Sequence, residues 1–129
     1  MIDRLFGGDA FIATTRALDA ASLRHQVIAN NLANVNTPGY KRQAVQFETQ
    51  LAQALQANNN ACAPANCVPV ASVTPRVVTI NSTSERTDGN NVDMETEMAN
   101  LAANTLTFEV LSQSVSGYFA GLKAVINGR

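Results

Sequence analysis

Apolar residues with a helical spacing occur at both ends of the chain, and they constrain its fold more than any other feature. Near the N-terminus the spacing alternates between three and four residues, which is typical of a helix that packs along one partner helix. Its members are Phe11, Thr14, Leu18, Ala21, His25, Ile28, Leu32 and Val35. We therefore predict a helix over residues 9–35, roughly 40 Å long, with Asp9 as its N-terminal cap.

The same spacing returns at the C-terminal end. Its members are Met94, Met98, Leu101, Thr105, Phe108, Ser112, Val115, Phe119, Leu122 and Ile126. Asp93 can cap this helix, and Glu95 and Glu97 fall in its first turn, where the helix dipole favours anions. We predict a helix over residues 93–127. A second apolar row, Leu111, Tyr118 and Val125, widens its face, to be covered either by neighbouring chains or by the middle of this chain.

These patterns predict a mainly α fold in which the long N- and C-terminal helices pair as an antiparallel coiled-coil-like hairpin. The middle segment, residues 36–92, is expected to be irregular with little β structure. It contains a short helix over Val45–Gln56 and a short strand over Val73–Ile80, whose partner is expected within residues 60–92 or on another subunit. With 129 residues, the chain forms at most one domain, residues 1–129.

Cys62 and Cys67 lie in an uncharged loop rich in Asn, Ala and Pro. Their spacing could close a small disulfide ring in an oxidising compartment, or the two thiols could remain free. Two thiols without a nearby histidine make a poor metal site, so we expect no metal there.

Composition argues against several classes of function. The net charge is -1 and the basic residues are scattered, so no basic stripe is available to bind nucleic acid. No apolar run approaches the roughly 18 residues of a membrane span, and the N-terminus lacks the pattern of a cleaved signal peptide. Taken alone, these features would indicate a cytosolic protein that does not insert into a membrane.

The sequence carries none of the common motifs for covalent or cofactor chemistry, so we expect no enzyme, no catalytic residue and no cofactor. His25 is predicted to be a half-buried structural residue, and Glu95 and Glu97 to be a solvated helix start. The interpretation that remains is a helical interaction module. Repeated contacts between copies of such a module form a ring when the rotation between neighbours closes on itself, and a helical filament when it does not. A small helical adaptor and a thiol-dependent protein are the alternatives.

The stretch that ends the first helix is unusually rich in asparagine. It reads Ala-Asn-Asn-Leu-Ala-Asn-Val-Asn-Thr-Pro-Gly-Tyr-Lys-Arg over residues 29–42, and Pro38-Gly39 breaks the helix there. A second polar stretch, Asn-Asn-Val-Asp-Met-Glu-Thr-Glu-Met over residues 90–98, begins the last helix. Asparagine amides can bond local backbone or reach another chain, so the row at the end of the first helix indicates either a C-terminal cap or a specific docking surface.

Together these two stretches resemble the terminal signatures of the bacterial flagellar rod, hook and hook-associated axial proteins. The long hook and distal-rod members carry large inserted domains, so the length and opening of this chain resemble the short subunits of the proximal rod. Of the two such subunits, the complete Asn-Thr-Pro-Gly-Tyr-Lys turn favours one, and the other is the alternative.

The resemblance implies a structural subunit that self-assembles through its terminal helices in the periplasmic rod of the basal body and transmits torque from motor to hook. It implies unfolded export through the type III apparatus without a cleaved signal peptide. The implied partners are other rod proteins, an adaptor at the MS-ring and export gate, the export apparatus and further copies of the chain. The implied assembly motif is Asn30, Asn31, Leu32, Ala33, Asn34, Val35, Asn36, Thr37, Pro38, Gly39 and Tyr40. The implied helix seam includes Phe11, Leu18, Ile28, Met98, Leu101, Phe108, Val115, Phe119 and Leu122.

Overall fold

The computed structural model describes residues 8–59, 69–81 and 86–128. Within these ranges the elements run in the order α2 (Asp9–Ala33), β1 (Gln43–Gln46), α3 (Glu48–Asn59), η1 (Val70–Ser72), β2 (Arg76–Thr79) and α4 (Met94–Ile126). Helices dominate and the strands are short, so the predicted mainly α fold is confirmed. Cys62 and Cys67 lie outside the described residues.

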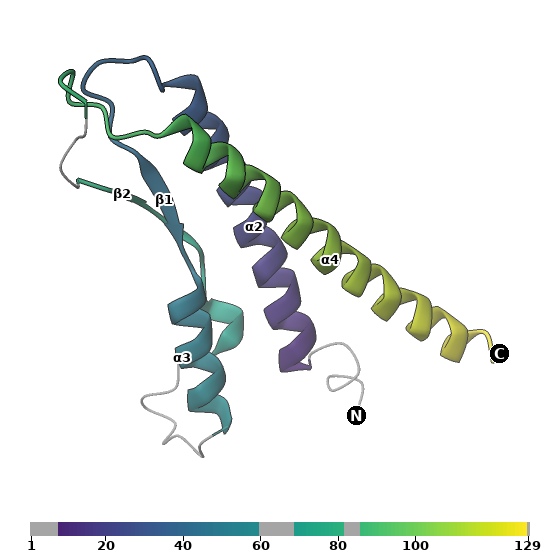
Figure 1. Ribbon diagram of the computed structural model, residues 1–129. Helices are drawn as coiled ribbons and strands as arrows, with labels where there is room; N and C mark the ends of the chain where they lie inside the picture. The colour runs from purple at the N-terminus through teal and green to yellow at the C-terminus, as the bar shows by residue number, and fades with distance from the viewer. Residues whose placement is uncertain (1–7, 60–68, 82–85, 129) are drawn as a thin grey trace.

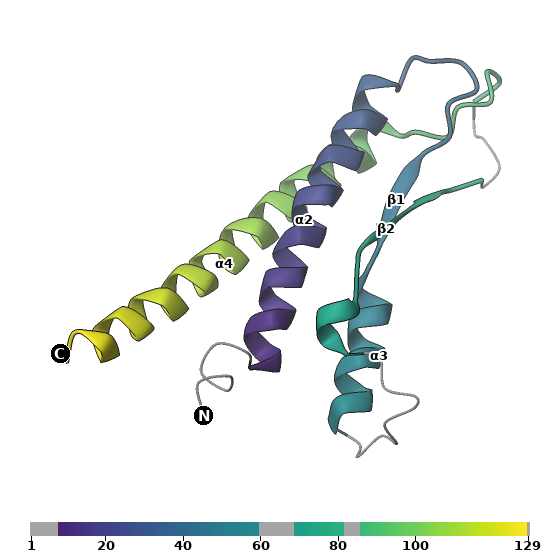
Figure 2. The ribbon, with the colours of Figure 1, turned by 180° about the vertical axis from the view of Figure 1, so that it is seen from behind.

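Helix α2 is the central element. The two views in Figures 1 and 2 place α4 along one side of α2, and the β1–β2 ribbon with α3 and η1 along the other. Helices α2 and α4 are antiparallel, because Asn31 contacts Glu97 at one end of α2 while Phe11 stacks on Tyr118 at the other. The C-terminal end of α4 extends away from the remaining elements (Figure 1).

The helix ends agree with the sequence within two residues but differ in their caps. Helix α2 ends at Ala33 rather than at residue 35, and its N-cap is Gly8, which makes no side-chain capping bond. Asp9 is instead the first helical residue, so its predicted capping role was wrong. Asp93 does cap α4, because its carboxylate accepts a hydrogen bond from the backbone N–H of Glu95.

The main apolar core lies between α2 and the middle segment. Its buried members are Ala20, Val27, Val45, Phe47, Ala54, Val70 and Val73, with Ile12, Ala13, Ala17, Leu23, Leu51 and Leu55 packed around them. None of these residues belongs to α4. The described residues of the middle segment therefore cover α2 and leave the wide apolar face of α4 open.

The two strands pair in a way that the sequence did not indicate. Strand β2 pairs antiparallel with β1, from Gln43 opposite Thr79 to Gln46 opposite Arg76. The prediction that this strand pairs within residues 60–92 or with another subunit was therefore wrong. The predicted helix over Val45–Gln56 also begins late, at Glu48, because Val45 and Phe47 are buried while Gln46 is exposed. This alternation is the period of a strand.

Candidate functional site

The candidate site is the junction where the turn after α2 meets the start of α4. Two glycines in the left-handed region shape it, Gly39 with φ 73° and Gly89 with φ 79°. The N–H of Gly39 donates to the carbonyl of Asp88 at 2.9 Å, and a Cβ added to Gly89 would lie 3.7 Å from the Cα of Gly39. The two turns therefore pack backbone against backbone, and an L side chain would be strained at either glycine.

Asn31, which is 0% exposed, joins α2 to both other parts of the junction. Its Nδ2 donates to the Gln43 carbonyl at 2.8 Å and to Oε2 of Glu97 at 2.9 Å. Its Oδ1 accepts from the Gln43 N–H at 3.0 Å and from the Tyr40 hydroxyl at 3.2 Å. Both ends of the amide are thus satisfied, and one side chain fixes the positions of β1 and α4 against α2.

Glu97 is the acidic partner in this network and is also 0% exposed. Its Oε1 accepts from Nε of Arg42 at 2.6 Å, in addition to the bond from Asn31 to Oε2. The sequence-based interpretation of Glu97 as part of a solvated helix start was therefore wrong. A buried carboxylate needs such partners because burial without them costs several kcal/mol.

Asn90 bonds the backbone at the C-terminal end of α2, although it lies more than 50 residues away in sequence. Its buried Nδ2 donates to the carbonyls of Asn34, Val35 and Thr37 at 2.9 to 3.1 Å. Its Oδ1 accepts from the N–H of Val92 at 2.7 Å. These carbonyls belong to the C-cap of α2 and to the turn that follows it, so Asn90 ties that turn to the segment before α4.

Asn91 fixes the entrance to the β1–β2 ribbon. Its Oδ1 accepts from the N–H of Arg42 at 2.7 Å, and its Nδ2 donates to the carbonyl of Ile80 at 2.7 Å. The second signature stretch, residues 90–98, therefore contacts the first stretch directly through Asn90, Asn91 and Glu97.

The structure distributes the implied assembly residues unevenly. Asn31 and Val35 are buried, Leu32, Asn34 and Tyr40 are half-buried, and Asn30, Ala33, Asn36, Thr37, Pro38 and Gly39 are exposed. Asn34 bonds its own helix end, since its Nδ2 donates to the Asn30 carbonyl at 2.8 Å. Asn30, Asn36 and Pro38 are thus exposed to solvent, whereas Asn31 belongs to the buried polar network.

The implied seam is also divided. Ile28 is buried, Phe11, Leu18, Leu101, Val115 and Leu122 are half-buried, and Met98, Phe108 and Phe119 are exposed. The fully buried positions on α4 are Glu97 and Asn104. One signal could have identified them, because the row Leu111, Tyr118 and Val125 reaches Asn104 and then Glu97 when it is continued backward in steps of seven. His25 is exposed, which contradicts its predicted half-buried state.

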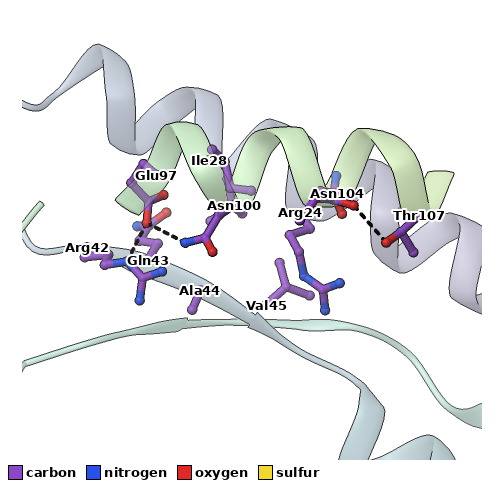
Figure 3. Close-up of a pocket in the computed structure, with 12 residues that line it drawn as sticks. Arg24, Ile28, Arg42, Gln43, Ala44, Val45, Glu97, Asn100, Asn104 and Thr107 are labelled. Atoms are coloured by element: carbon purple, nitrogen blue, oxygen red, sulfur yellow. Dashed lines mark hydrogen bonds and ion pairs between the residues drawn. The ribbon is translucent and has the colours of Figure 1, made fainter. Parts of the chain in front are cut away.

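A cavity of about 260 Å³ opens beside the junction, between α2, β1 and α4. Figure 3 shows the side chains of Glu97, Asn100 and Thr107 on one side, with those of Arg42, Gln43 and Val45 opposite. Its remaining lining residues are Arg24, Val27, Ile28, Ala44, Ala103 and Asn104. Both guanidinium groups are paired, Arg42 with Glu97 and Arg24 with Glu48.

Two carboxyl groups titrate below their ordinary values. The pKa of Asp93 is lowered first by the hydrogen bond from the Thr96 hydroxyl and then by the N–H of Glu95. Partial burial acts to raise the pKa of Glu48, but hydrogen bonds from Arg24 and from backbone N–H groups outweigh it and the pKa is lowered. Both carboxyl groups therefore favour the folded state when they are charged.

Away from the junction, α2 and α4 are joined by rings. The centroids of Phe11 and Tyr118 are 4.5 Å apart in a stacked pair, and Phe119 meets Phe11 edge-on at 5.7 Å. Beyond this contact α4 is largely uncovered, with Val125 74% and Ile126 77% exposed. The described residues contain no group of three or more His, Cys, Asp or Glu side chains that could hold a metal. The arrangement is suited to holding helices in place and presenting an apolar surface.

Among the described residues, no helix combines the length and apolar character that a membrane crossing requires.

Comparison with known proteins gives a consistent result. The family model described as "Flagella basal body rod protein" matches residues 13–41. The chain is 33% identical to the flagellar basal body rod protein FlgB of Bacillus subtilis over 114 residues, covering 87% of this chain and 88% of that protein. It is 34% identical to FlgB of Borrelia hermsii over 122 residues, covering 86% and 90%. It is 27% identical to FlgB of Escherichia coli over 136 residues, covering 98% and 97%.

Proposed function

Since the chain belongs to the FlgB family of flagellar basal body rod proteins, we propose that it transmits torque in the proximal rod and self-assembles there through its terminal helices. It is a structural subunit of the flagellar basal body rod. This membership favours FlgB over FlgC, the other short proximal rod subunit that the sequence resembles.

The observation that carries the proposal is the incomplete cover on α4. One end of the helix is held by the buried contacts of Asn31, Arg42 and Glu97. The rest presents apolar side chains to solvent, including Leu106, Val110 and Val125, which are 64%, 67% and 74% exposed. A large exposed apolar surface on a folded chain is typical of an interaction site. Repeated contacts of this kind can transmit force along a shaft without a large private core.

The proposal assigns two roles to the residues that the resemblance implies. Asn30, Asn36 and Pro38 form an exposed edge for contacts between subunits, and Asn31 holds the terminal helices in the geometry that those contacts require. It treats residues 1–129 as a single rod-type domain and assigns the chain no catalytic role.

As a member of this family the chain associates with other basal body components. In finer detail, the proposal places it in the periplasmic rod after type III export without signal cleavage. Its contacts there are with other rod proteins, with an adaptor at the MS-ring and export gate, and with the export apparatus itself.

Deletion of the coding sequence tests the proposal. We expect cells without flagella that grow normally, and motility restored by the wild-type chain on a plasmid. Electron microscopy of isolated basal bodies would then show no rod in the deletion strain. Normal flagella in that strain would contradict the proposal.

A cysteine-free variant, Cys62→Ser with Cys67→Ser, separates the proposal from the thiol-dependent alternative. It should restore motility in the deletion strain, because assembly through helices needs neither thiol. Loss of motility with this variant, despite normal amounts of protein, would favour the thiol-dependent reading.

A further inference from the structure

Helix α4 continues past the point where the described part of α2 begins. The stacked rings of Phe11 and Tyr118 mark that point, and residues 119–126 extend the helix beyond it by about 12 Å. Both views show this end leading away from the other described elements (Figures 1 and 2). Val125 and Ile126, which are 74% and 77% exposed, lie there. The last turns of α4 therefore present apolar side chains that the described residues do not cover.

The two helices are also incompletely packed at this end. A cavity of about 290 Å³ lies between them, and its lining residues are Ala10, Phe11, Thr14, Ser114, Val115 and Tyr118. None of these six side chains is charged. The cavity and the last turns of α4 therefore both favour an apolar occupant.

The antiparallel register indicates which part of the chain comes opposite the last turns of α4. The contacts between the helices run in order along both of them, from Asn31 with Glu97, through Ala21 with Asn104, to Phe11 with Tyr118. Because both helices rise equally per residue, one step toward the N-terminus on α2 matches one step toward the C-terminus on α4. Counted onward from the Phe11 and Tyr118 pair, residues 3–7 come opposite residues 122–126.

The segment before α2 has a suitable sequence. It reads Met-Ile-Asp-Arg-Leu-Phe-Gly over residues 1–7, which lie outside the described part of the chain. Ile2, Leu5 and Phe6 have the spacing of a single apolar face. On α4, Leu122 and Val125 follow Tyr118 by four and three residues, so the face that meets Phe11 continues to the end of the helix.

The chain before α2 can also reach this surface. Gly8, the N-cap of α2, has φ -59° and ψ 132°, so the helix does not continue through it and the preceding chain can turn toward α4. Seven extended residues span at most about 25 Å, about twice the length of the uncovered turns. Attachment at Gly8 also holds the segment near α4 at an effective concentration of the order of millimolar.

We propose that residues 1–7 fold back onto the C-terminal end of α4, where Leu5 and Phe6 are buried against Leu122 and Val125. The register and the attachment at Gly8 select this segment over a second copy of the chain. In this position the segment extends the pairing of the terminal helices to the end of α4 and shields its most exposed apolar residues in the isolated subunit. The inference concerns a single copy and does not rest on the proposed function.

Cysteine cross-linking of the isolated full-length subunit tests the contact. The variant carries Leu5→Cys and Val125→Cys in a background with Cys62→Ser and Cys67→Ser, and it is oxidised at a concentration far below that of the tethered segment. We expect a disulfide-bonded monomer that migrates faster on a non-reducing gel. The matched control replaces Val125→Cys by Ala120→Cys, which is exposed on the opposite face of the same turns of α4. Its bond should form about tenfold more slowly.

Two outcomes of this experiment would overturn the proposal. Equal rates for the two variants would mean that the segment does not select the face of Val125. Disulfide-linked dimers in place of the bonded monomer would identify the occupant as a second copy. Neither outcome affects the deletion test of the proposed function.

A second experiment measures how well the segment shields α4. A single Val125→Cys in the same background is alkylated with and without Phe6→Asp, and circular dichroism checks that the variant remains folded. We expect alkylation about tenfold faster with Phe6→Asp, because a charged side chain is costly to bury against an apolar surface. Phe6→Leu keeps an apolar side chain and should leave the rate unchanged. The same slow rate in folded Phe6→Asp would contradict the proposal.

Discussion

The two parts of α4 differ in what covers them. Over residues 94–104 the buried side chains are polar, Glu97 and Asn104, and each is bonded to another element. Over residues 106–126 none of the side chains is fully buried, and the exposed ones include Leu106, Val110 and Ile126. Burial on this helix thus follows contact geometry rather than residue polarity, because the described part of the chain covers the apolar part of α4 only partly.

This difference separates folding from assembly along one helix. The polar part has a few directional bonds that specify one arrangement of α2, β1 and α4. The apolar part has a non-directional surface that gains free energy only when another surface covers it. Substitutions in the first part should therefore lower the stability of the subunit, and substitutions in the second should affect contacts between subunits.

The largest effect on the subunit should come from Glu97→Ala. It leaves Arg42 and the amide of Asn31 without their buried acceptor, and we expect a loss of about 3 kcal/mol in the free energy of unfolding. Urea unfolding followed by circular dichroism measures it. Glu97→Gln keeps the size and one acceptor oxygen and should lose less, about 1 to 2 kcal/mol. A loss below about 0.5 kcal/mol for Glu97→Ala would mean that the polar part does not hold the helices.

A smaller effect is expected for Phe11→Ala, which removes the ring contacts between α2 and the apolar part of α4. Phe11 is only half-buried, so we expect a loss of about 1 to 2 kcal/mol in the same measurement. Leu106→Ala, at an exposed position on the same part of α4, is the control and should change little. Equal losses for the two variants would show that the described ring contacts do not stabilise the subunit.

Acid should weaken the start of α4 by a smaller amount. The pKa of Asp93 in the folded chain lies below its ordinary value of 3.8, so the charged carboxylate stabilises the fold above about pH 4. That contribution is lost as the pH falls through the folded pKa. Comparing the urea stability of the wild type and Asp93→Asn between about pH 5 and pH 2.5 isolates it, and the wild type should lose more. The same loss in both proteins would assign the acid sensitivity to other groups.

The smallest effect on the isolated subunit is expected for Val110→Asp. Val110 is 67% exposed, so the free energy of unfolding should change by no more than about 0.5 kcal/mol. Motility should nevertheless be lost, because the charge would be buried without a partner between subunits. Gln53→Asp adds the same charge to α3 and should swim normally. Motile Val110→Asp cells would show that this face is not an interface.

Local patterns predicted the terminal helices well and the middle segment poorly. The ends of α4 agree with its heptad row and the Asp93 cap because each signal depends only on residues a few positions apart in sequence. Strand β1 was missed because its partner residues in β2 lie about 30 or more positions away in sequence, and no local signal encodes such a pairing. The bonds from Asn31 to Glu97, from Arg42 to Glu97 and from Asn90 to the turn after α2 were missed for the same reason, since each joins residues more than 50 positions apart in sequence.

The sequence by itself determined the helices, the break at Pro38-Gly39 and the two polar signatures, because backbone preferences and apolar spacing act over a few residues. Only the tertiary structure decided that Glu97 is buried, that the core covers α2 and that the outer face of α4 remains open. The spacing of apolar residues shows that a helix face needs a partner, but the partner is selected by the packing of the whole chain.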